Sequence, residues 1–329
     1  MSEVSTSIAV NAIRLHWVKG LNEICGKLNK GLTGWLCDED YQVYEPLEQN
    51  GFVLHVTDGR LLLSAIAYDC TRMAIASFES IESVKKHPSF PKSSAWGLLQ
   101  SYYAAFFAAH AILRMLGISC SQIGYQETNA VLKIASLYGN AGNLSVPSRF
   151  YACRYEGERK SISCNRINVG AGGVHESFWS VFCERMRSLS DEILISSSRS
   201  IESQLVYVKL TELCSNLSYA QCTNGSWLSF IRNEVNYRHR FGCWFPYRDY
   251  TQANESFLRI RDIWRGDPMG MNLRYVKGQE LDQFRMTCAF IISLCRILIM
   301  EMAKRCPEGR SFHLFGALAF LNYSKRART

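Results

Sequence analysis

Apolar residues recur at steps of three and four along several stretches of the chain, the spacing of a helix with one buried face. The stretch 93–117, SSAWGLLQSYYAAFFAAHAILRMLG, places Tyr103, Phe106 and His110 at such steps. A serine pair can cap its start and Gly117 can end it. Small alanines between the larger residues would let another helix approach closely, so we predict an interior helix of a bundle. We expect His110 to be a hydrogen-bonded core residue.

The same spacing predicts further helices near 7–30, 176–194, 201–217, 254–266 and 279–306. The most apolar of these stretches, 286–302, is interrupted by Arg296 and Glu301. We therefore interpret it as a buried core helix and expect no membrane span.

The N-terminal third has a different pattern. In 51–70, GFVLHVTDGRLLLSAIAYDC, two apolar runs flank Asp58-Gly59, a dipeptide that favours a β-hairpin. Prolines at 88 and 91 then interrupt the chain. We predict a mainly α protein: a small α+β region over 1–90 and an up-and-down helical bundle over 91–329, with a large irregular insertion at about 139–200.

Charge and cysteine content narrow the class of partner. The net charge of +8 and a pI near 8.8 favour a polyanionic partner such as RNA. The 13 cysteines include no C-x-x-C pair, and the first residues are not a secretory signal, so we expect reduced thiols in a cytoplasmic protein. Neither a metal-ligand spacing nor a phosphate-binding loop is present, so we expect no metal and no cofactor.

The segment 229–240, SFIRNEVNYRHR, concentrates polar chemistry. A helix turns by about 100° per residue, so the fourth and seventh positions after Arg232 return to its face. These positions are Asn236 and His239, and Asn233 lies beside them. We predict that the four side chains project together.

Such a set suits metal-independent cleavage of RNA, in which the ribose 2′-OH loses a proton and the 5′-oxygen gains one. His239 can transfer protons near neutral pH. Arg232 can donate two hydrogen bonds to the non-bridging oxygens, where charge develops. Asn233 or Asn236 could orient either group. The need for a 2′-OH would confine cleavage to RNA.

The arginine, its polar neighbour and a histidine after six intervening residues resemble the signature of HEPN domains from prokaryotic defence and toxin systems. The alanine- and aromatic-rich stretch 93–117 resembles the helix that many HEPN proteins carry upstream. The long region between these two features and the first ninety residues have no counterpart in a minimal HEPN domain.

The resemblance implies a helical bundle that forms a homodimer, with two motifs facing each other in one endoribonuclease site. It implies cleavage of single-stranded RNA or tRNA in anti-phage defence, with an antitoxin or another defence-system protein as a partner. Arg232 would bind phosphate, Asn233 would be the polar neighbour and His239 the catalytic histidine.

Other interpretations stay open. The chain could be a catalytically inert HEPN-like scaffold that binds RNA or a protein in a defence complex. Arg232 and Arg238 could instead pair with nearby acids on a solvated helix whose end is capped by His239.

Basic residues interleaved with aromatics in 148–166 could follow an RNA backbone while the rings stack on bases, although a solvated loop would look similar. The residues predicted to bind RNA are Arg149, Arg154, Arg159, Lys160, Arg166, Arg238 and Arg240. In 168–179, NVGAGGVHESFW, we interpret the glycines as a turn before a helix, with phosphate contact through the helix N-terminus as the alternative. We predict no other role for His175, which lies in that segment.

Overall fold

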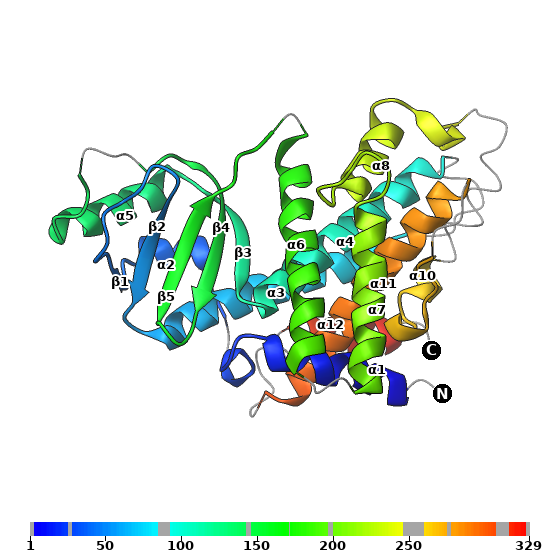
Figure 1. The fold of residues 1–329 in the computed structure, drawn as a ribbon, viewed down its shortest axis with the longest axis horizontal. Helices are drawn as coiled ribbons and strands as arrows, with labels where there is room; N and C mark the ends of the chain where they lie inside the picture. The colour runs from blue at the N-terminus through cyan, green and yellow to red at the C-terminus, as the bar shows by residue number, and fades with distance from the viewer. Residues whose placement is uncertain are drawn as a thin grey trace. The chain divides into compact units, whose positions relative to one another are not determined.

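The computed structural model describes residues 3–25, 28–84, 93–142, 146–170, 172–196, 200–245, 260–274, 278–306 and 316–326. It is mainly helical with one small antiparallel sheet, as predicted (Figure 1). The chain divides into two compact units. Unit 1 comprises Met1–His16, Ala74–Ala109 and His175–Ile299, and unit 2 comprises Trp17–Met73, His110–Val174 and Met300–Thr329.

The helices are α1 (Glu3–Ile13), α2 (Leu32–Cys37), α3 (Gly59–Glu82), α4 (Ala95–Met115), α5 (Tyr125–Leu137), α6 (Gly173–Ser196), α7 (Ile201–Leu217), α8 (Trp227–Asn236), α10 (Ile260–Ile263), α11 (Glu280–Lys304) and α12 (Ala317–Arg326). Short 3-10 helices occur at Arg14–His16, Leu21–Glu23, Arg240–Gly242 and Pro268–Gly270. The helices predicted at 93–117, 176–194, 201–217 and 279–306 are confirmed. The prolines at 88 and 91 and residues 254–259 of the predicted helix 254–266 lie outside the described residues, and α10 lies in the rest of that prediction.

Unit 1 is a helical assembly whose centre includes α4. The alanines predicted to admit a neighbouring helix are buried: Ala104, Ala105, Ala108 and Ala109. On one side the Trp179 indole of α6 donates a hydrogen bond to the Tyr102 hydroxyl of α4. Helices α6 and α7 run side by side, with Cys183 and Cys214 in contact (Figure 1). Tyr102 and Phe106 of α4 also pack against the Trp179 ring of α6, so large aromatic side chains form this contact between the two helices.

Helices α3 and α11 are each long and apolar enough to cross a membrane by length and composition alone. In α11, 78% of the most apolar window is buried inside the protein, and in α3 the share is 50%. The burial of α11 is that of a core helix.

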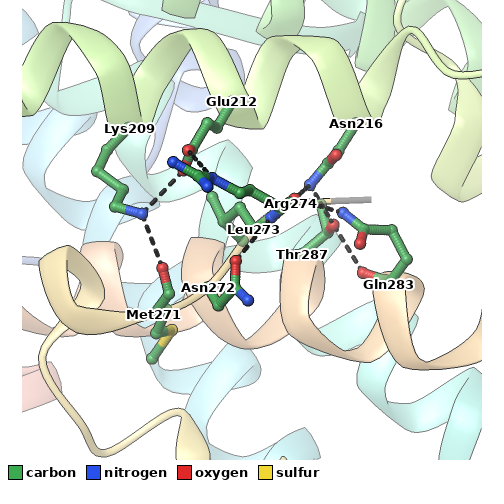
Figure 2. A network of polar contacts seen from close by, with 9 residues as sticks. All are labelled: Lys209, Glu212, Asn216, Met271, Asn272, Leu273, Arg274, Gln283 and Thr287. Atoms are coloured by element: carbon green, nitrogen blue, oxygen red, sulfur yellow. Dashed lines mark hydrogen bonds and ion pairs between the residues drawn. The ribbon is translucent and has the colours of Figure 1, made fainter. Parts of the chain in front are cut away.

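Polar side chains hold residues 271–273, between α10 and α11, in place (Figure 2). Lys209 Nζ of α7 donates to the Met271 carbonyl at 2.9 Å. Asn216 Nδ2 of α7 and Gln283 Nε2 of α11 both donate to the Leu273 carbonyl, each at 2.8 Å. These bonds satisfy the Met271 and Leu273 carbonyls, so residues 271–273 are fixed against both helices.

Unit 2 contains the sheet, whose strand order is β1-β2-β5-β4-β3 with antiparallel pairing throughout. The strands are β1 (Tyr41–Gln42), β2 (Gly51–Val56), β3 (Ile118–Ile123), β4 (Arg149–Glu156) and β5 (Ser161–Arg166). One face buries Leu54, Ile162 and Cys153. Leu32 of α2 and Ile66 of α3 lie on this side.

The prediction of a β-hairpin at Asp58-Gly59 is wrong. After β2 the chain enters α3 at Gly59, because the Asp58 carboxylate accepts from the Arg60 amide at 2.8 Å and so caps the helix. The partner of β2 is β5, more than a hundred residues later, with Phe52 opposite Cys164. The segment 139–200, expected to be irregular, thus supplies two ordered strands and α6. The predicted division at residue 90 differs from the division into the two units.

Candidate functional site

The candidate site forms around α8 of unit 1. This helix buries Trp227, Leu228, Ile231 and Val235, which recur at helical spacing and fix the rotation of the helix. Arg232 follows Ile231, so its side chain leaves the buried stripe at an edge and stays partly buried. The packing of α8 therefore determines where the guanidinium lies.

The Arg232 guanidinium is held by oxygens and aromatic rings. Nη2 donates to the Tyr103 hydroxyl at 3.0 Å, and Nη1 donates to Asn233 Oδ1 at 2.6 Å. Its Cζ atom lies 5.6 Å from the ring centre of Tyr237 and 5.9 Å from those of Tyr102 and Tyr103. Such rings attract a cation without neutralising it. Among the described residues no carboxylate pairs with Arg232, so its positive charge is available to an anion.

A histidine with no predicted catalytic role, His175, lies beside the same two tyrosines. Its Nδ1 is 3.0 Å from the Tyr102 hydroxyl, and its ring centre lies 5.7 Å from that of Tyr102 and 5.9 Å from that of Tyr103. The Tyr102 hydroxyl accepts from Trp179 and has its own proton to donate to Nδ1. In that arrangement His175 carries its proton on Nε2.

His175 is a neutral imidazole at neutral pH. Burial, and next the positive charge of Arg232, lower the pKa of His175 to about 4. Burial also raises the pKa of the Tyr102 hydroxyl above its usual range. The hydrogen bond between these two groups therefore joins neutral partners, and Arg232 carries the charge of the cluster.

The expectation that His239 shares a helical face with Arg232 is wrong. Helix α8 ends at Asn236, and His239 has left-handed backbone angles (φ 52°, ψ 32°). The Trp244 indole folds back and donates to the Val235 carbonyl at 2.7 Å, which uses an acceptor of the last helical turn. The His239 side chain is exposed, with its ring centre 5.9 Å from that of Trp244. Asn236 is the last helical residue.

Arg238 and Arg240 differ from Arg232 because both pair with Glu234. Their Nη1 atoms lie 2.7 Å and 2.8 Å from its two carboxylate oxygens. The Glu234 side chain is only 2% exposed, whereas the two arginines are more than half exposed. They offset a buried negative charge. The interpretation of acid-paired arginines thus holds for Arg238 but not for Arg232.

The other predicted RNA-binding residues lie in unit 2, on the β4–β5 hairpin: Arg149, Arg154, Arg159, Lys160 and Arg166. Alternation along β4 puts Arg149 and Arg154 on opposite faces of the sheet. Arg159 pairs with Glu156 at 3.5 Å, and Lys160 sits in the turn with a φ of 47°. The five residues therefore do not form one continuous surface, and RNA contact stays a prediction.

Three residues of the cluster were missed or assigned to packing: Tyr102, Tyr103 and His175. A sequence signal was present, since a pair of tyrosines in an otherwise apolar helix brings two hydroxyl groups that need partners when buried. His110 is buried, and Arg114 Nη1 donates to its Nδ1 at 3.0 Å, which confirms a hydrogen-bonded core residue. In the described part of the chain, no group of three His, Cys, Asp or Glu side chains could hold a metal ion.

No family model, no curated protein and no solved structure matches the chain. The assignment of a function therefore depends on the geometry around Arg232 and on the motif that contains it.

Proposed function

We propose that the protein is a metal-independent endoribonuclease of the HEPN type, acting in the cytoplasm in anti-phage defence or as a toxin. The observation that carries the proposal is the contrast within one short segment. Arg238 and Arg240 are paired with Glu234, whereas Arg232 is fixed by Tyr103 and Asn233 and keeps its charge. A preorganised guanidinium that no carboxylate of the described residues neutralises suits the charge that develops on a phosphate during cleavage.

In the proposed reaction the ribose 2′-oxygen attacks phosphorus and the bond to the 5′-oxygen breaks. Arg232 stabilises the extra negative charge on the non-bridging oxygens. His239 removes the 2′-OH proton, and the histidine of a second copy protonates the leaving oxygen. The products carry a 2′,3′-cyclic phosphate and a 5′-hydroxyl. The exposed position of His239, beyond the end of α8, is compatible with a site completed by a second copy.

The test is RNA cleavage in EDTA by the wild type, Arg232→Ala and His239→Ala proteins, with cyclic-phosphate ends detected on the products. We expect cleavage by the wild type and a loss of at least about 100-fold in both variants. Cleavage that persists in both variants, or that requires Mg²⁺, would exclude this mechanism.

A second function is supported by one observation: α8 ends at Asn236, so His239 lies outside the helix that carries Arg232. The protein would then be an inert scaffold that binds RNA or a protein of a defence complex. Growth on overexpression separates the two functions. A ribonuclease should be toxic and His239→Ala should relieve the toxicity, whereas a scaffold should give the same growth with either protein.

A further inference from the structure

We infer that Arg232 and His175 bind one phosphate group together, and that His175 takes up a proton when the phosphate binds. This inference rests on the proposed function and names a second imidazole in the same site. The ligand is a phosphodiester of single-stranded RNA. A free oxyanion has the same chemistry and is separated from RNA by the experiment below.

Arg232 and His175 lie around the same two tyrosine rings. The two tyrosines of α4 connect the two groups: the Tyr103 hydroxyl accepts from Arg232, and the Tyr102 hydroxyl bonds to His175 Nδ1. The Arg232 Cζ atom and the His175 ring centre each lie within 6 Å of both tyrosine ring centres. Three elements, α4, α6 and α8, thus fix a guanidinium and an imidazole around one pair of rings.

The backbone at the start of α6 also favours an anion. His175 is the third residue of α6, a helix of 24 residues, where amide groups without intrahelical partners favour an anion. The same position disfavours a protonated histidine in the absence of an anion. A phosphate at this place would meet the helix N-terminus, the imidazole Nε2–H and the Arg232 guanidinium.

The charged groups around His175 influence its protonation state. Among the described groups that face His175, α4 contributes the neutral Tyr102 and Tyr103, and α8 contributes Arg232. On α6 itself, the neighbouring Glu176 carboxylate accepts from Asn224. Arg232 is thus the charged group that acts on the imidazole, and its positive charge favours the neutral form of His175. A bound phosphate would reverse this influence by placing a negative charge beside the imidazole, and an opposite charge at contact distance raises a histidine pKa by about 1–3 units.

Proton uptake follows from that reversal. Near pH 5.5 the unliganded imidazole is mostly neutral, because burial and Arg232 lower its pKa to about 4. With the pKa raised by about two units in the complex, His175 would be mostly protonated at the same pH, so binding would draw in about 0.5 to 1 proton. The proton would add to Nδ1, which would then donate to the Tyr102 hydroxyl oxygen, and that hydroxyl would turn its own proton away. The imidazolium Nε2–H would donate a charged hydrogen bond to the phosphate, which is stronger than a neutral one.

The experiment is calorimetric titration with a 2′-O-methyl RNA trinucleotide at pH 5.5, in two buffers of different ionisation enthalpy. This probe, made of uridine alone and without terminal phosphates, cannot be cleaved. Neither its diesters nor its bases titrate at this pH, so any proton taken up from the buffer binds to the protein. We expect uptake of about 0.5 to 1 proton by the wild type. His175→Asn should bind about tenfold more weakly with no uptake. Arg232→Ala should lose binding, and His16→Asn, which replaces a histidine that pairs with Glu192, should keep the uptake.

Two further measurements guard the interpretation. Sulfate, which also does not titrate, should bind weakly and be displaced by the trinucleotide. Sulfate binding that the trinucleotide does not displace would assign the site to a free anion and overturn the RNA assignment. Tyr102→Phe keeps the imidazole but removes its partner, so uptake should persist with a shifted pH midpoint. Thermal unfolding of each variant verifies that it is folded.

The outcomes separate the inference from the proposed function. Wild-type cleavage in EDTA with no proton uptake, or uptake that survives His175→Asn, would overturn the role of His175 and leave the nuclease intact. Uptake that depends on His175 in a protein that cuts no RNA would support the phosphate site and contradict the nuclease.

Discussion

Two groups of arginines within nine residues are used in opposite ways. Arg238 and Arg240 are more than half exposed and pair with Glu234, a carboxylate that is almost fully buried. Arg232 is partly buried, yet its partners are a phenol, an amide and aromatic rings. In the first group the positive charge offsets a buried negative charge. In Arg232 the guanidinium is oriented by hydrogen bonds, and no carboxylate of the described residues neutralises its charge.

This difference teaches how to distinguish a structural arginine from one prepared for a ligand. Neutralisation by a carboxylate removes the charge that would attract a phosphate, whereas hydrogen bonds to neutral oxygens orient the planar fork and leave its charge intact. Closeness in the sequence does not distinguish Arg232 from Arg238 and Arg240. The groups that each arginine contacts do distinguish them.

The largest expected effect comes from replacing the fork of Arg232. Arg232→Lys keeps the charge but cannot reach Tyr103, Asn233 and a phosphate in the same planar arrangement. We expect the cleavage rate to fall by about 100-fold in a fluorescent oligonucleotide assay. Arg238→Lys is the matched control and should change the rate by less than about threefold. Equal rates for both variants would show that the orientation of Arg232 is unimportant.

The next effect is on stability. Replacing both Arg238 and Arg240 by alanine leaves the Glu234 carboxylate buried without its partners. We expect the free energy of unfolding to fall by about 2 kcal/mol in urea titrations. Adding Glu234→Gln should restore most of this loss, because the buried negative charge is removed. A double variant as stable as the wild type would mean that Glu234 needs no counter-ion.

A smaller effect depends on pH. Burial and Arg232 lower the pKa of His175 to about 4, so between this value and about 6.5 the unfolded chain binds more protons than the folded one. The contribution of His175 to stability is therefore full above about pH 6.5 and is lost as the pH falls toward 4. Allowing for partial solvent exposure, we expect a loss of about 1–2 kcal/mol.

His175→Asn should flatten this part of the stability profile, as measured by urea unfolding at a series of pH values. His16 provides a control, since burial also lowers its pKa and His16→Asn should remove a separate part of the slope. A profile unchanged by His175→Asn would contradict the environment described for the imidazole.

The smallest effect is expected on the sheet. Arg154 is exposed on β4 and lies on the face opposite to Arg149. If this face contacts RNA, Arg154→Glu should weaken binding about two- to threefold and lower the salt dependence slightly. Arg149→Glu tests the other face. Unchanged binding in both variants would remove the hairpin from the RNA-binding surface.

Local patterns in the sequence predicted much of the helical structure. The interior helix α4, the core helix α11 and α7 follow from apolar spacing, because each buries a continuous stripe. Long-range pairing was not accessible in this way: β2 and β5 are distant in the chain, and nothing in β2 specifies its partner. Asp58 favours a turn and a helix cap equally well, and the helix that follows decided between them.

The candidate site was predicted in part. Arg232 and Asn233 were identified from the motif, and their side chains are hydrogen-bonded to each other. The end of α8 was not predicted, because it depends on Trp244 folding back onto Val235. The proximity of His175 to Arg232 depends on the packing of α4 between α6 and α8, which a single motif cannot reveal.

The central claim is that Arg232 acts on phosphate, whereas Arg238 serves Glu234. Its most direct test is the single-turnover cleavage rate of one labelled RNA oligonucleotide in EDTA, measured for the wild type, Arg232→Ala and Arg238→Ala. The account predicts a loss of at least about 100-fold for Arg232→Ala and a rate within about threefold of wild type for Arg238→Ala. Equal losses in the two variants, or a wild type that leaves the oligonucleotide intact, would contradict it.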